Sequence, residues 1–309
     1  MMVIPLGTAS AVPTRTRHLS GTVLVHGGAT LLFDCGEGAQ LRMLQAGISH
    51  TKVDAIFITH LHGDHYFGML GLLSTMAMLN RKTSLTIVAP SELENLLEQL
   101  PGTRTEDLPF PIHYVGLRED FSRGIVYESG DFVVEARCVE HRIFTVGYRF
   151  MENPRPGNLD VEGARARGVT DVLHYRVLKR GHDVVLADGS VVASTDVVAP
   201  APEPRAFAYI TDTRPCQAAV DLSRGATLVY HEATFGHALQ KRASETGHST
   251  AREAAEVARQ AGAVRLILGH FSARYLDVSE LVEEARSVFP NAEAAVELER
   301  YELRNASLT

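Results

Sequence analysis

The heptapeptide Thr59-His60-Leu61-His62-Gly63-Asp64-His65 places three histidines and an aspartate within six residues. It follows an apolar run, residues 53–58, that is typical of a buried strand, so its polar side chains begin where a loop can gather them. In an extended chain the first two histidines point to the same side, because side chains alternate with a period of two. The aspartate and the third histidine come after the chain turns and can face a second position nearby. The spacing therefore predicts two adjacent metal positions.

A histidine taken alone is more often an ordinary core or surface residue than a metal ligand, and this chain has 14 histidines. The heptapeptide does not fit the interpretation of ordinary residues, because polar groups clustered against the end of an apolar strand are costly to bury unless something neutralises them. Clusters of histidine and carboxylate are typical of sites for zinc and related metals. We therefore expect the heptapeptide to bind metal.

The composition predicts a water-soluble protein with a sizeable core. The 309 residues are 45% hydrophobic, which is enough for one large domain or two. The amino terminus has no basic flank before an apolar segment, and no apolar run approaches the length that crosses a bilayer, so we expect a cytoplasmic protein without membrane association. The formal net charge of -7 argues against unselective binding of nucleic acid, although it allows a local basic patch.

The three cysteines, Cys35, Cys138 and Cys216, are widely spaced and include no Cys-x-x-Cys pair. An odd number of isolated cysteines does not indicate a disulfide framework. We expect them to be reduced and to take no part in metal binding.

Short apolar strands alternate with helices along the chain, a pattern that predicts an α/β fold. The expected strands are residues 3–6, 22–25, 30–33, 53–58, 85–88, 132–139, 206–210, 226–230 and 264–268, and the expected helices are residues 39–45, 67–79, 91–100 and 250–261. The helix at 67–79 has little polar face, so we expect it to be buried. Ser91 with Glu94, and Thr250 with Glu253, have the spacing of capping boxes at helix starts.

Three more residues that can bind metal, His141, Asp212 and His270, each lie just beyond one of these expected strands. Loops at strand ends are where open sheets present functional side chains. Taken singly, each of the three is more often an ordinary residue. Together with the heptapeptide they supply the ligands that two four- or five-coordinate metals would still need.

Residues 152–204 differ from the rest of the chain, because prolines and glycines interrupt a stretch with few apolar side chains. This stretch is too short and polar to bury much of a core, so we expect a protruding arm rather than an independent domain. Between residues 153 and 182 basic side chains outnumber acidic ones; the basic ones are Arg155, Arg165, Arg167, Arg176, Lys179 and Arg180. A solvated loop explains this local charge equally well.

Taken in order, His60-x-His62-x-Asp64-His65, His141, Asp212 and His270 resemble the ligand pattern of the metallo-β-lactamase superfamily, whose members fold as an αββα sandwich. Within that superfamily the chain resembles the short form of ribonuclease Z, the tRNA 3′-processing endonuclease. The resembling segments span nearly the full length and are residues 6–13, 32–37, 58–68, 147–149, 212–214, 231–235, 248–250 and 270–275. The metal cluster alone indicates only the superfamily, whereas the last three segments are more specific.

The resemblance implies a centre with two zinc ions. Its ligands would be His60, His62 and His141 for one Zn²⁺, Asp64, His65 and His270 for the other, and Asp212 as a bridge between them. Mn²⁺ and Fe²⁺ are alternatives, since this set of donors accommodates several metals. Two such ions about 3.5–4 Å apart can clamp a phosphodiester oxygen and lower the pKa of a bound water towards neutrality.

The resemblance also implies catalytic roles for three side chains. Asp64 would orient the attacking water as an accepting base in addition to binding metal. His248, held by Glu232, would protonate the leaving oxygen, a role that suits an imidazole titrating near pH 7. Without the resemblance, His248 is equally well interpreted as an ordinary residue at a helix start.

By the same resemblance, residues 152–204 match a flexible arm that is inserted in one catalytic domain, residues 1–309, and grips the tRNA away from the cut. The basic residues of the arm would then contact phosphates without reading sequence. Family arms usually carry Gly-Pro after a Gly-Val pair, whereas this chain has Gly168-Val169-Thr170-Asp171-Val172-Leu173-His174-Tyr175. A second departure is Glu297, where the family usually has aspartate.

Three hypotheses follow. The favoured one is a zinc-dependent endonuclease that removes the 3′ trailer from precursor tRNA and leaves a 3′-hydroxyl, as a homodimer in which each arm serves the partner's active site. The second is a phosphodiesterase or other hydrolase that acts on a small molecule with the same metals, which the altered arm and the negative net charge would suit. The third, a non-catalytic relative that binds RNA or protein, is least favoured, because all seven ligand positions are filled.

Overall fold

The chain forms two structural units in the computed structural model, which describes residues 1–304. The larger unit consists of Met1–Met151 and Ala206–Arg304, and the smaller one of Glu152–Arg205. Among the described residues, no helix combines the length and the apolar character that a membrane span requires.

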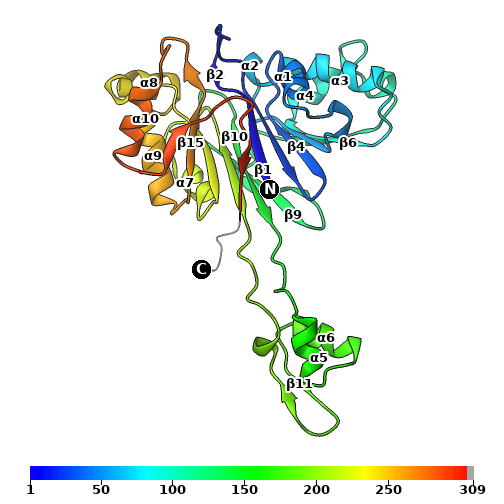
Figure 1. Cartoon of the computed structure of the whole chain (residues 1–309). Coiled ribbons are helices and arrows are strands. Elements are labelled where there is room, and N and C mark those ends of the chain that lie inside the picture. The colour runs from blue at the N-terminus through cyan, green and yellow to red at the C-terminus, as the bar shows by residue number, and fades with distance from the viewer. Residues whose placement is uncertain (305–309) are drawn as a thin grey trace. The chain divides into compact units, whose positions relative to one another are not determined.

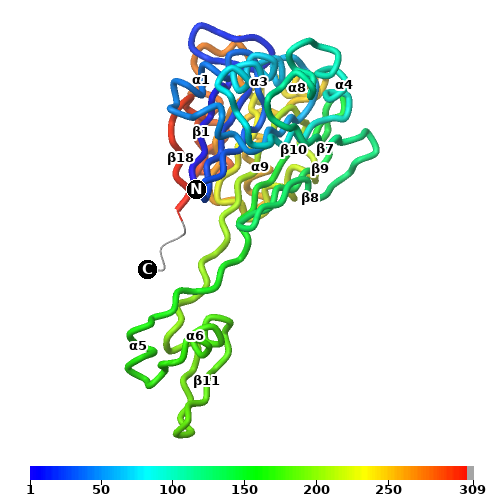
Figure 2. The backbone as a smooth tube through the Cα atoms, turned by 90° about the vertical axis from the view of Figure 1, so that its right-hand side faces the viewer, coloured from blue at the N-terminus to red at the C-terminus, as the bar shows by residue number. Residues whose placement is uncertain are grey.

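The larger unit contains two seven-stranded mixed sheets (Figure 1). The first sheet has the order β18 (Tyr301–Glu302), β1 (Met2–Gly7), β3 (Gly21–His26), β4 (Ala29–Phe33), β5 (Ala55–Phe57), β6 (Leu85–Pro90) and β7 (Ile112–Leu117). Its first four strands pair antiparallel, and β4 to β7 pair parallel. Strand β18 therefore joins the carboxyl-terminal part of the chain to β1, and Figure 2 shows the two side by side.

The second sheet has the order β17 (Ala292–Ala294), β15 (Leu266–Gly269), β14 (Leu228–Glu232), β13 (Ala206–Ile210), β10 (Val146–Glu152), β9 (Phe132–Cys138) and β8 (Arg123–Glu128). Strands β17 to β13 pair parallel, β13 pairs antiparallel with β10, and β9 pairs antiparallel with β8. A short parallel pair, β2 (Ala9–Ser10) with β16 (Phe271–Ser272), lies outside both sheets.

Each sheet has helices on its outer face (Figure 1). Those packed with the first sheet are α1 (Ala39–Gln45), α2 (Gly63–Tyr66), α3 (Gly68–Met78) and α4 (Glu92–Glu98), with 3₁₀ turns η1 (His50–Lys52) and η2 (Thr105–Asp107). Those packed with the second sheet are α7 (Gln217–Ser223), α9 (Ala251–Gln260) and α10 (Ser279–Arg286). Helix α8 (Gln240–Thr246) and the 3₁₀ turn η4 (His237–Leu239) lie on the same side of the unit. The predicted αββα sandwich is confirmed.

Strand β4 is apolar at successive positions because both of its faces are buried. Leu31 and Phe33 belong to the core between the two sheets, whereas Leu32 belongs to the core between the first sheet and its helices. A strand buried on both faces reads as a continuous apolar run rather than as an alternation. The core between the sheets is rich in aromatic side chains, and its largest members are Phe33, Phe57, Phe132, Tyr148, Phe150, Phe207, Tyr209 and Tyr230.

Four local predictions for the helices differ in outcome. The capping box of Thr250 and Glu253 is confirmed, but the one predicted at Ser91 is wrong, because the Ser91 side chain makes no capping hydrogen bond. Helix formation also begins before residue 67, at Gly63, so that the last part of the heptapeptide is helical. The prediction that residues 67–79 are buried holds for one face only, since Met78 is 83% exposed.

The smaller unit, Glu152–Arg205, contains α5 (Val161–Ala166), α6 (Val172–Lys179), the hairpin β11 (Val184–Val185) with β12 (Val191–Val192), and the 3₁₀ turn η3 (Ser194–Asp196). Its buried apolar side chains form a small cluster of their own: Ala164, Val169, Leu178, Val184, Val192 and Val197. The two ends of the unit meet, because the Glu152 N–H donates to the Arg205 carbonyl at 3.0 Å. The Glu152 carboxylate also accepts from Arg205 Nε at 2.9 Å.

Candidate metal centre

Seven potential ligands meet where strands of the larger unit end. The loop after β5 and helix α2 carry four of them, and the loops after β9, β13 and β15 carry one each. One group, with its ligand atoms within 4.8 Å of one another, is His60, His62, His141 and Asp212, and a second such group is Asp64, His65 and His270. Every side chain that the sequence singles out as a ligand therefore lies in this one place, supplied by strands of both sheets.

The Asp212 carboxylate lies between the two groups. Its Oδ2 atom is 3.5 Å from His60 Nε2 and 3.7 Å from His141 Nε2. Its Oδ1 atom is 3.3 Å from His65 Nε2 and 3.0 Å from His270 Nε2. Because each oxygen faces a different set of histidines, the carboxylate has the geometry of a bridging ligand.

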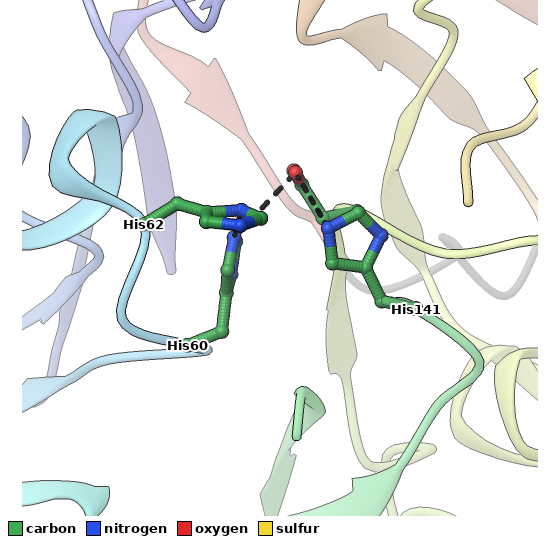
Figure 3. A group of neighbouring side chains, drawn as sticks. His60, His62 and His141 are labelled. Atoms are coloured by element: carbon green, nitrogen blue, oxygen red, sulfur yellow. Dashed lines mark hydrogen bonds and ion pairs between the residues drawn. The ribbon is translucent and has the colours of Figure 1, made fainter. Parts of the chain in front are cut away.

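The three histidine rings of the first group are directed toward one another (Figure 3). His60 Nε2 lies 2.9 Å from His62 Nδ1, and the ring centroids of His62 and His141 are 5.2 Å apart. The sequence placed His60 and His62 on one side of an extended segment, and the short distance between their rings agrees with that arrangement.

In the second group, Asp64 Oδ2 lies 3.4 Å from His65 Nε2 and 3.7 Å from His270 Nε2. The same oxygen accepts a hydrogen bond of 2.8 Å from the Ala11 N–H, which belongs to the loop that follows β2. This backbone donor fixes the orientation of the carboxylate.

The buried polar atoms of the centre test whether these residues fit a metal. The Nε2 atoms of His65, His141 and His270 are buried and have no hydrogen-bond partner among the described residues. A buried polar atom without a partner costs about 1–3 kcal/mol. Divalent cations bound by these nitrogens and by the carboxylates would satisfy all three, and imidazole with carboxylate is a donor set that suits Zn²⁺. The residues therefore fit a metal centre.

The surroundings shift the pKa values of the potential ligands in different directions. Burial, together with the nearby His65, holds the pKa of His60 well below its ordinary value, which keeps the neutral imidazole that binds metal. Burial raises the pKa of Asp212, but His270 and His65 lower it more, so the net pKa lies well below the ordinary value. Burial lowers the pKa of His270, but Asp212 raises it more, to about 10. A cation would take the same Nε2 lone pair of His270, so proton and metal compete there.

Asp34 orients His65, a potential ligand, from the side away from the centre. Its Oδ2 atom lies 2.8 Å from His65 Nδ1 and accepts from the Tyr209 hydroxyl at 3.1 Å, and its Oδ1 atom accepts from the Thr59 N–H at 2.8 Å. A metal-binding histidine commonly uses its second ring nitrogen in this way, and the partner fixes both ring orientation and tautomer.

Two further ligands are held through their Nδ1 atoms. His141 Nδ1 lies 2.7 Å from the Gly247 carbonyl, to which it donates, and His270 Nδ1 lies 3.0 Å from the Thr234 hydroxyl. In both rings this leaves Nε2 as the atom that faces Asp212.

Backbone strain accumulates at the same place. Asp34, Asp212 and His270 have φ values of 55°, 46° and 55°, in the left-handed region that residues other than glycine seldom adopt. Each such residue costs on the order of 1–3 kcal/mol and persists only where its surroundings impose it. Asp34 and His270 follow directly after β4 and β15, and Asp212 lies two residues after β13, so the strain accompanies the turns that place these side chains at or beside the centre.

Close backbone contacts hold helix α2 in position. A Cβ on Gly68 would lie 2.1 Å from the Gly36 carbonyl oxygen, and a Cβ on Gly36 would lie 2.4 Å from the Asp64 carbonyl oxygen. The Cys35 N–H donates to the His65 carbonyl at 2.7 Å. Glycine is therefore required at both positions for α2 and the start of α3 to approach the segment that carries Asp34.

His248 and Glu232 form an ion pair beside the centre. His248 Nδ1 lies 3.0 Å from Glu232 Oε1, and Glu232 is fully buried. The Glu232 carboxylate also accepts from the Thr213 N–H at 2.7 Å and from the Thr234 hydroxyl at 2.5 Å. Burial lowers the pKa of His248, but Glu232 raises it more, so the net pKa lies above its ordinary value. His248 also lies with Asp212 in a third group of possible ligands.

A cavity of about 650 Å³ lies at the centre. Its lining includes five of the ligands, His62, Asp64, His141, Asp212 and His270, together with Leu19, Glu37, Phe67, Arg142, Phe235 and His248. The cavity gives a substrate access to both groups of ligands and to His248.

Glu297 ties together segments that are distant in the sequence. It accepts hydrogen bonds from the Thr8 N–H, the His18 N–H and Arg42 Nη2 at 2.8–3.0 Å. The loop between Thr8 and His18 carries Ala11, whose N–H holds Asp64. Glu297 therefore supports the loop that holds Asp64.

The sequence-based prediction gave no role to Asp34, Thr234 or Gly247. A signal existed for Asp34, since it follows an expected strand as the predicted ligands do. The Gly247 carbonyl is a main-chain group, so its residue type carries no such signal.

The fold and the site define the class of the protein. The structure is similar to the crystal structure of human tRNase Z, short form, with a TM-score of 0.69 and 26% identity over 98% of this chain and all of that chain. It is also similar to the metallo-β-lactamase fold protein YhfI from Bacillus subtilis, with a TM-score of 0.67 and 18% identity over 97% of this chain and 98% of that one. The chain has the metallo-β-lactamase fold. A family model described as Anti-Pycsar protein Apyc1 matches residues 1–107.

Proteins of similar sequence identify the family more specifically than the structural similarities do. The chain is 50% identical to ribonuclease Z of Salinibacter ruber (strain DSM 13855 / M31) over 302 residues, 97% of this chain and 94% of that protein. It is 40% identical to ribonuclease Z of Geobacillus kaustophilus (strain HTA426) over 308 residues, 98% of this chain and 99% of that protein. The chain belongs to the ribonuclease Z family.

Replacing Asp34 tests the support of the metal ligands. We expect Asp34→Asn to weaken Zn²⁺ binding roughly 10- to 100-fold, because His65 loses the carboxylate that orients it. Competition with a chromophoric chelator measures the affinity. The control is Asp54→Asn, which alters an exposed carboxylate that accepts from the Thr30 N–H at 2.8 Å in the same sheet. Wild-type affinity in Asp34→Asn would contradict the assigned role.

Proposed function

We propose that the chain is a metal-dependent endonuclease that removes the 3′ trailer from precursor tRNA and leaves a 3′-hydroxyl on the tRNA. The observation that carries this proposal is the convergence of a complete set of histidine and aspartate ligands on Asp212, in a chain that belongs to the ribonuclease Z family.

We assign two Zn²⁺ ions to the centre, with Mn²⁺ and Fe²⁺ as alternatives that the same donors accept. The proposed ligands are His60, His62 and His141 for one ion, Asp64, His65 and His270 for the other, and Asp212 for both. When bound, such a pair supplies Lewis-acid polarisation of a phosphoryl oxygen and makes water nucleophilic at neutral pH.

Asp64 and His248 would handle the protons of the reaction. The Asp64 carboxylate, held by the Ala11 N–H, would accept a hydrogen bond from the attacking water and orient it toward phosphorus. His248 has Nδ1 engaged with Glu232, so Nε2 is the nitrogen that would donate a proton into the cavity. The raised pKa of His248 favours the protonated acid.

These roles define which bonds form and break when the phosphodiester is hydrolysed. Water would form a bond to phosphorus and give a proton to the Asp64 carboxylate, the P–O3′ bond would break, and His248 would give its proton to the departing O3′. The tRNA then carries the 3′-hydroxyl and the trailer carries the 5′-phosphate. Glu232 would stabilise the imidazolium before transfer and fix the ring for it.

The direct test is cleavage of a precursor tRNA with a 3′ trailer by Zn²⁺-loaded protein, beside His248→Ala and a linear RNA of equal length. We expect cutting just after the acceptor stem, weaker cutting of the linear RNA, and a loss of roughly a hundredfold or more in His248→Ala, the usual effect of removing a general acid. Metal content by mass spectrometry should stay at the wild-type level in the variant. Loss of metal would make His248 a ligand or a structural support instead.

The alternative function is hydrolysis of a small phosphodiester by the same centre. It is supported by the altered arm, in which Asp171 caps helix α6 by accepting from the Leu173 N–H at 2.8 Å, in the segment that replaces the usual Gly-Pro. Hydrolysis of small diesters with no cleavage of precursor tRNA would favour this alternative over the endonuclease.

We propose that the smaller unit, Glu152–Arg205, acts as the arm that binds the tRNA body. It contains a cavity of about 830 Å³ whose lining includes Arg155, Arg176, Lys179, Arg180, Ser194 and Thr195, with no aspartate or glutamate among the described lining residues. Guanidinium, ammonium and hydroxyl groups are the side-chain donors that contact phosphates. We also propose that the enzyme is a cytoplasmic homodimer in which each arm serves the partner's site.

Removing charge from the arm tests this role. We expect the triple variant Arg176→Gln, Lys179→Gln, Arg180→Gln to raise KM for precursor tRNA. In a plot of log KM against the logarithm of the salt concentration, the slope should decrease by roughly 0.7–0.9 for each phosphate that the arm no longer binds. Turnover of bis(p-nitrophenyl) phosphate should not change. The matched control neutralises three exposed charges of the larger unit, Arg118, Lys241 and Arg304. Equal losses on both substrates would reject the arm assignment.

A further inference from the structure

We propose that Arg142 binds a phosphate of the RNA strand next to the one that is cleaved. This inference rests on the proposed endonuclease function and adds a binding residue to it. Arg142 directly follows the ligand His141 in the loop between β9 and β10, and its side chain is exposed.

Arg142 is distinguished first by its charge. It is the single lysine or arginine among the described residues that line the 650 Å³ cavity, whose acidic lining residues are Glu37, Asp64 and Asp212. A polyanionic strand that enters the cavity therefore meets this one basic side chain besides the metal centre and His248. In a chain of net charge -7, its position in the cavity matters for binding.

Arg142 is distinguished secondly by its lack of a partner. Within the described part of the chain its guanidinium makes no hydrogen bond or ion pair. Two arginines that contact the lining residue Ser272 already have partners, since Arg17 donates to the Ser272 and Tyr275 carbonyls and Arg274 to the Ser272 hydroxyl. All the donors of Arg142 are therefore available to a ligand.

The stem of Arg142 is nevertheless held in place. A Cβ on Gly247 would lie 3.2 Å from Arg142 Cγ and 3.4 Å from its backbone N, so the first part of the side chain packs against this glycine. Gly247 has a φ of 80°, and its carbonyl accepts from His141 Nδ1. The base of Arg142 is thus fixed relative to the ligand His141, while its guanidinium remains at the surface of the cavity.

The chemistry of this arrangement fits a phosphate diester. A guanidinium can donate two parallel hydrogen bonds to phosphate oxygens, and it gains more from doing so when no carboxylate competes. The phosphate that is cleaved would lie at the metal centre, beside His248. An RNA strand brings further phosphates into the cavity, which a small diester lacks, so Arg142 contributes to RNA and not to small substrates.

The test compares Arg142→Gln and Arg142→Lys with wild type and with Arg118→Gln, which removes the same charge from an exposed side chain outside the cavity lining. Each Zn²⁺-loaded protein is assayed on precursor tRNA with a 3′ trailer over a range of KCl concentrations, and on bis(p-nitrophenyl) phosphate. We expect Arg142→Gln to lower kcat/KM on RNA roughly tenfold, as for removal of a hydrogen bond to a charged group. In a plot of log kcat/KM against log KCl concentration, the magnitude of the slope for Arg142→Gln should be smaller than that of the wild type by about 0.7–0.9, the value for one bound phosphate.

Arg142→Lys should keep the wild-type salt slope, and all variants should keep wild-type turnover of the small diester. An unchanged slope in Arg142→Gln, an equal loss on both substrates, or the same effect in Arg118→Gln would overturn the inference. Failure of the wild type to cleave precursor tRNA would overturn the proposed function and this inference together. Cleavage by the wild type with an unchanged slope in Arg142→Gln would overturn the role of Arg142 alone.

Discussion

The position of the Asp212 carboxylate between two sets of histidines is the interaction on which the rest of the structure depends. One oxygen faces His60 and His141, and the other faces His65 and His270. For the five side chains to meet, strands from two different sheets must end at the same place. The αββα sandwich provides this meeting point, because its aromatic core packs the two sheets face to face.

The fold is destabilised locally at this meeting point. The Nε2 atoms of three histidines are buried without a hydrogen-bond partner among the described residues, and Asp34, Asp212 and His270 adopt left-handed backbone conformations. Metal binding would offset much of this cost, so we expect the stability of the larger unit and its metal affinity to be linked. The Nδ1 contacts of His65 and His141 limit the freedom of the rings before a metal arrives.

The alternation of strands and helices predicted an α/β fold, and the resemblance to the metallo-β-lactamase superfamily implied the αββα sandwich. Ligand-type residues at the ends of apolar strands singled out the side chains that meet at the centre. The sequence did not predict the contacts that hold the ligands in place. Asp34 meets His65 across 31 positions and the Gly247 carbonyl meets His141 across 106, and no local pattern links such pairs. The sequence also did not predict that the guanidinium of Arg142 is free, since only the folded structure shows which arginines already have partners.

The most direct test of this account is anomalous X-ray scattering at the zinc edge from crystals of the Zn²⁺-loaded protein. The account predicts two peaks about 3.5–4 Å apart, with Asp212 between them. One peak should lie beside His60, His62 and His141, and the other beside the second group of ligands. A single peak, or two peaks of which neither contacts Asp212, would contradict it.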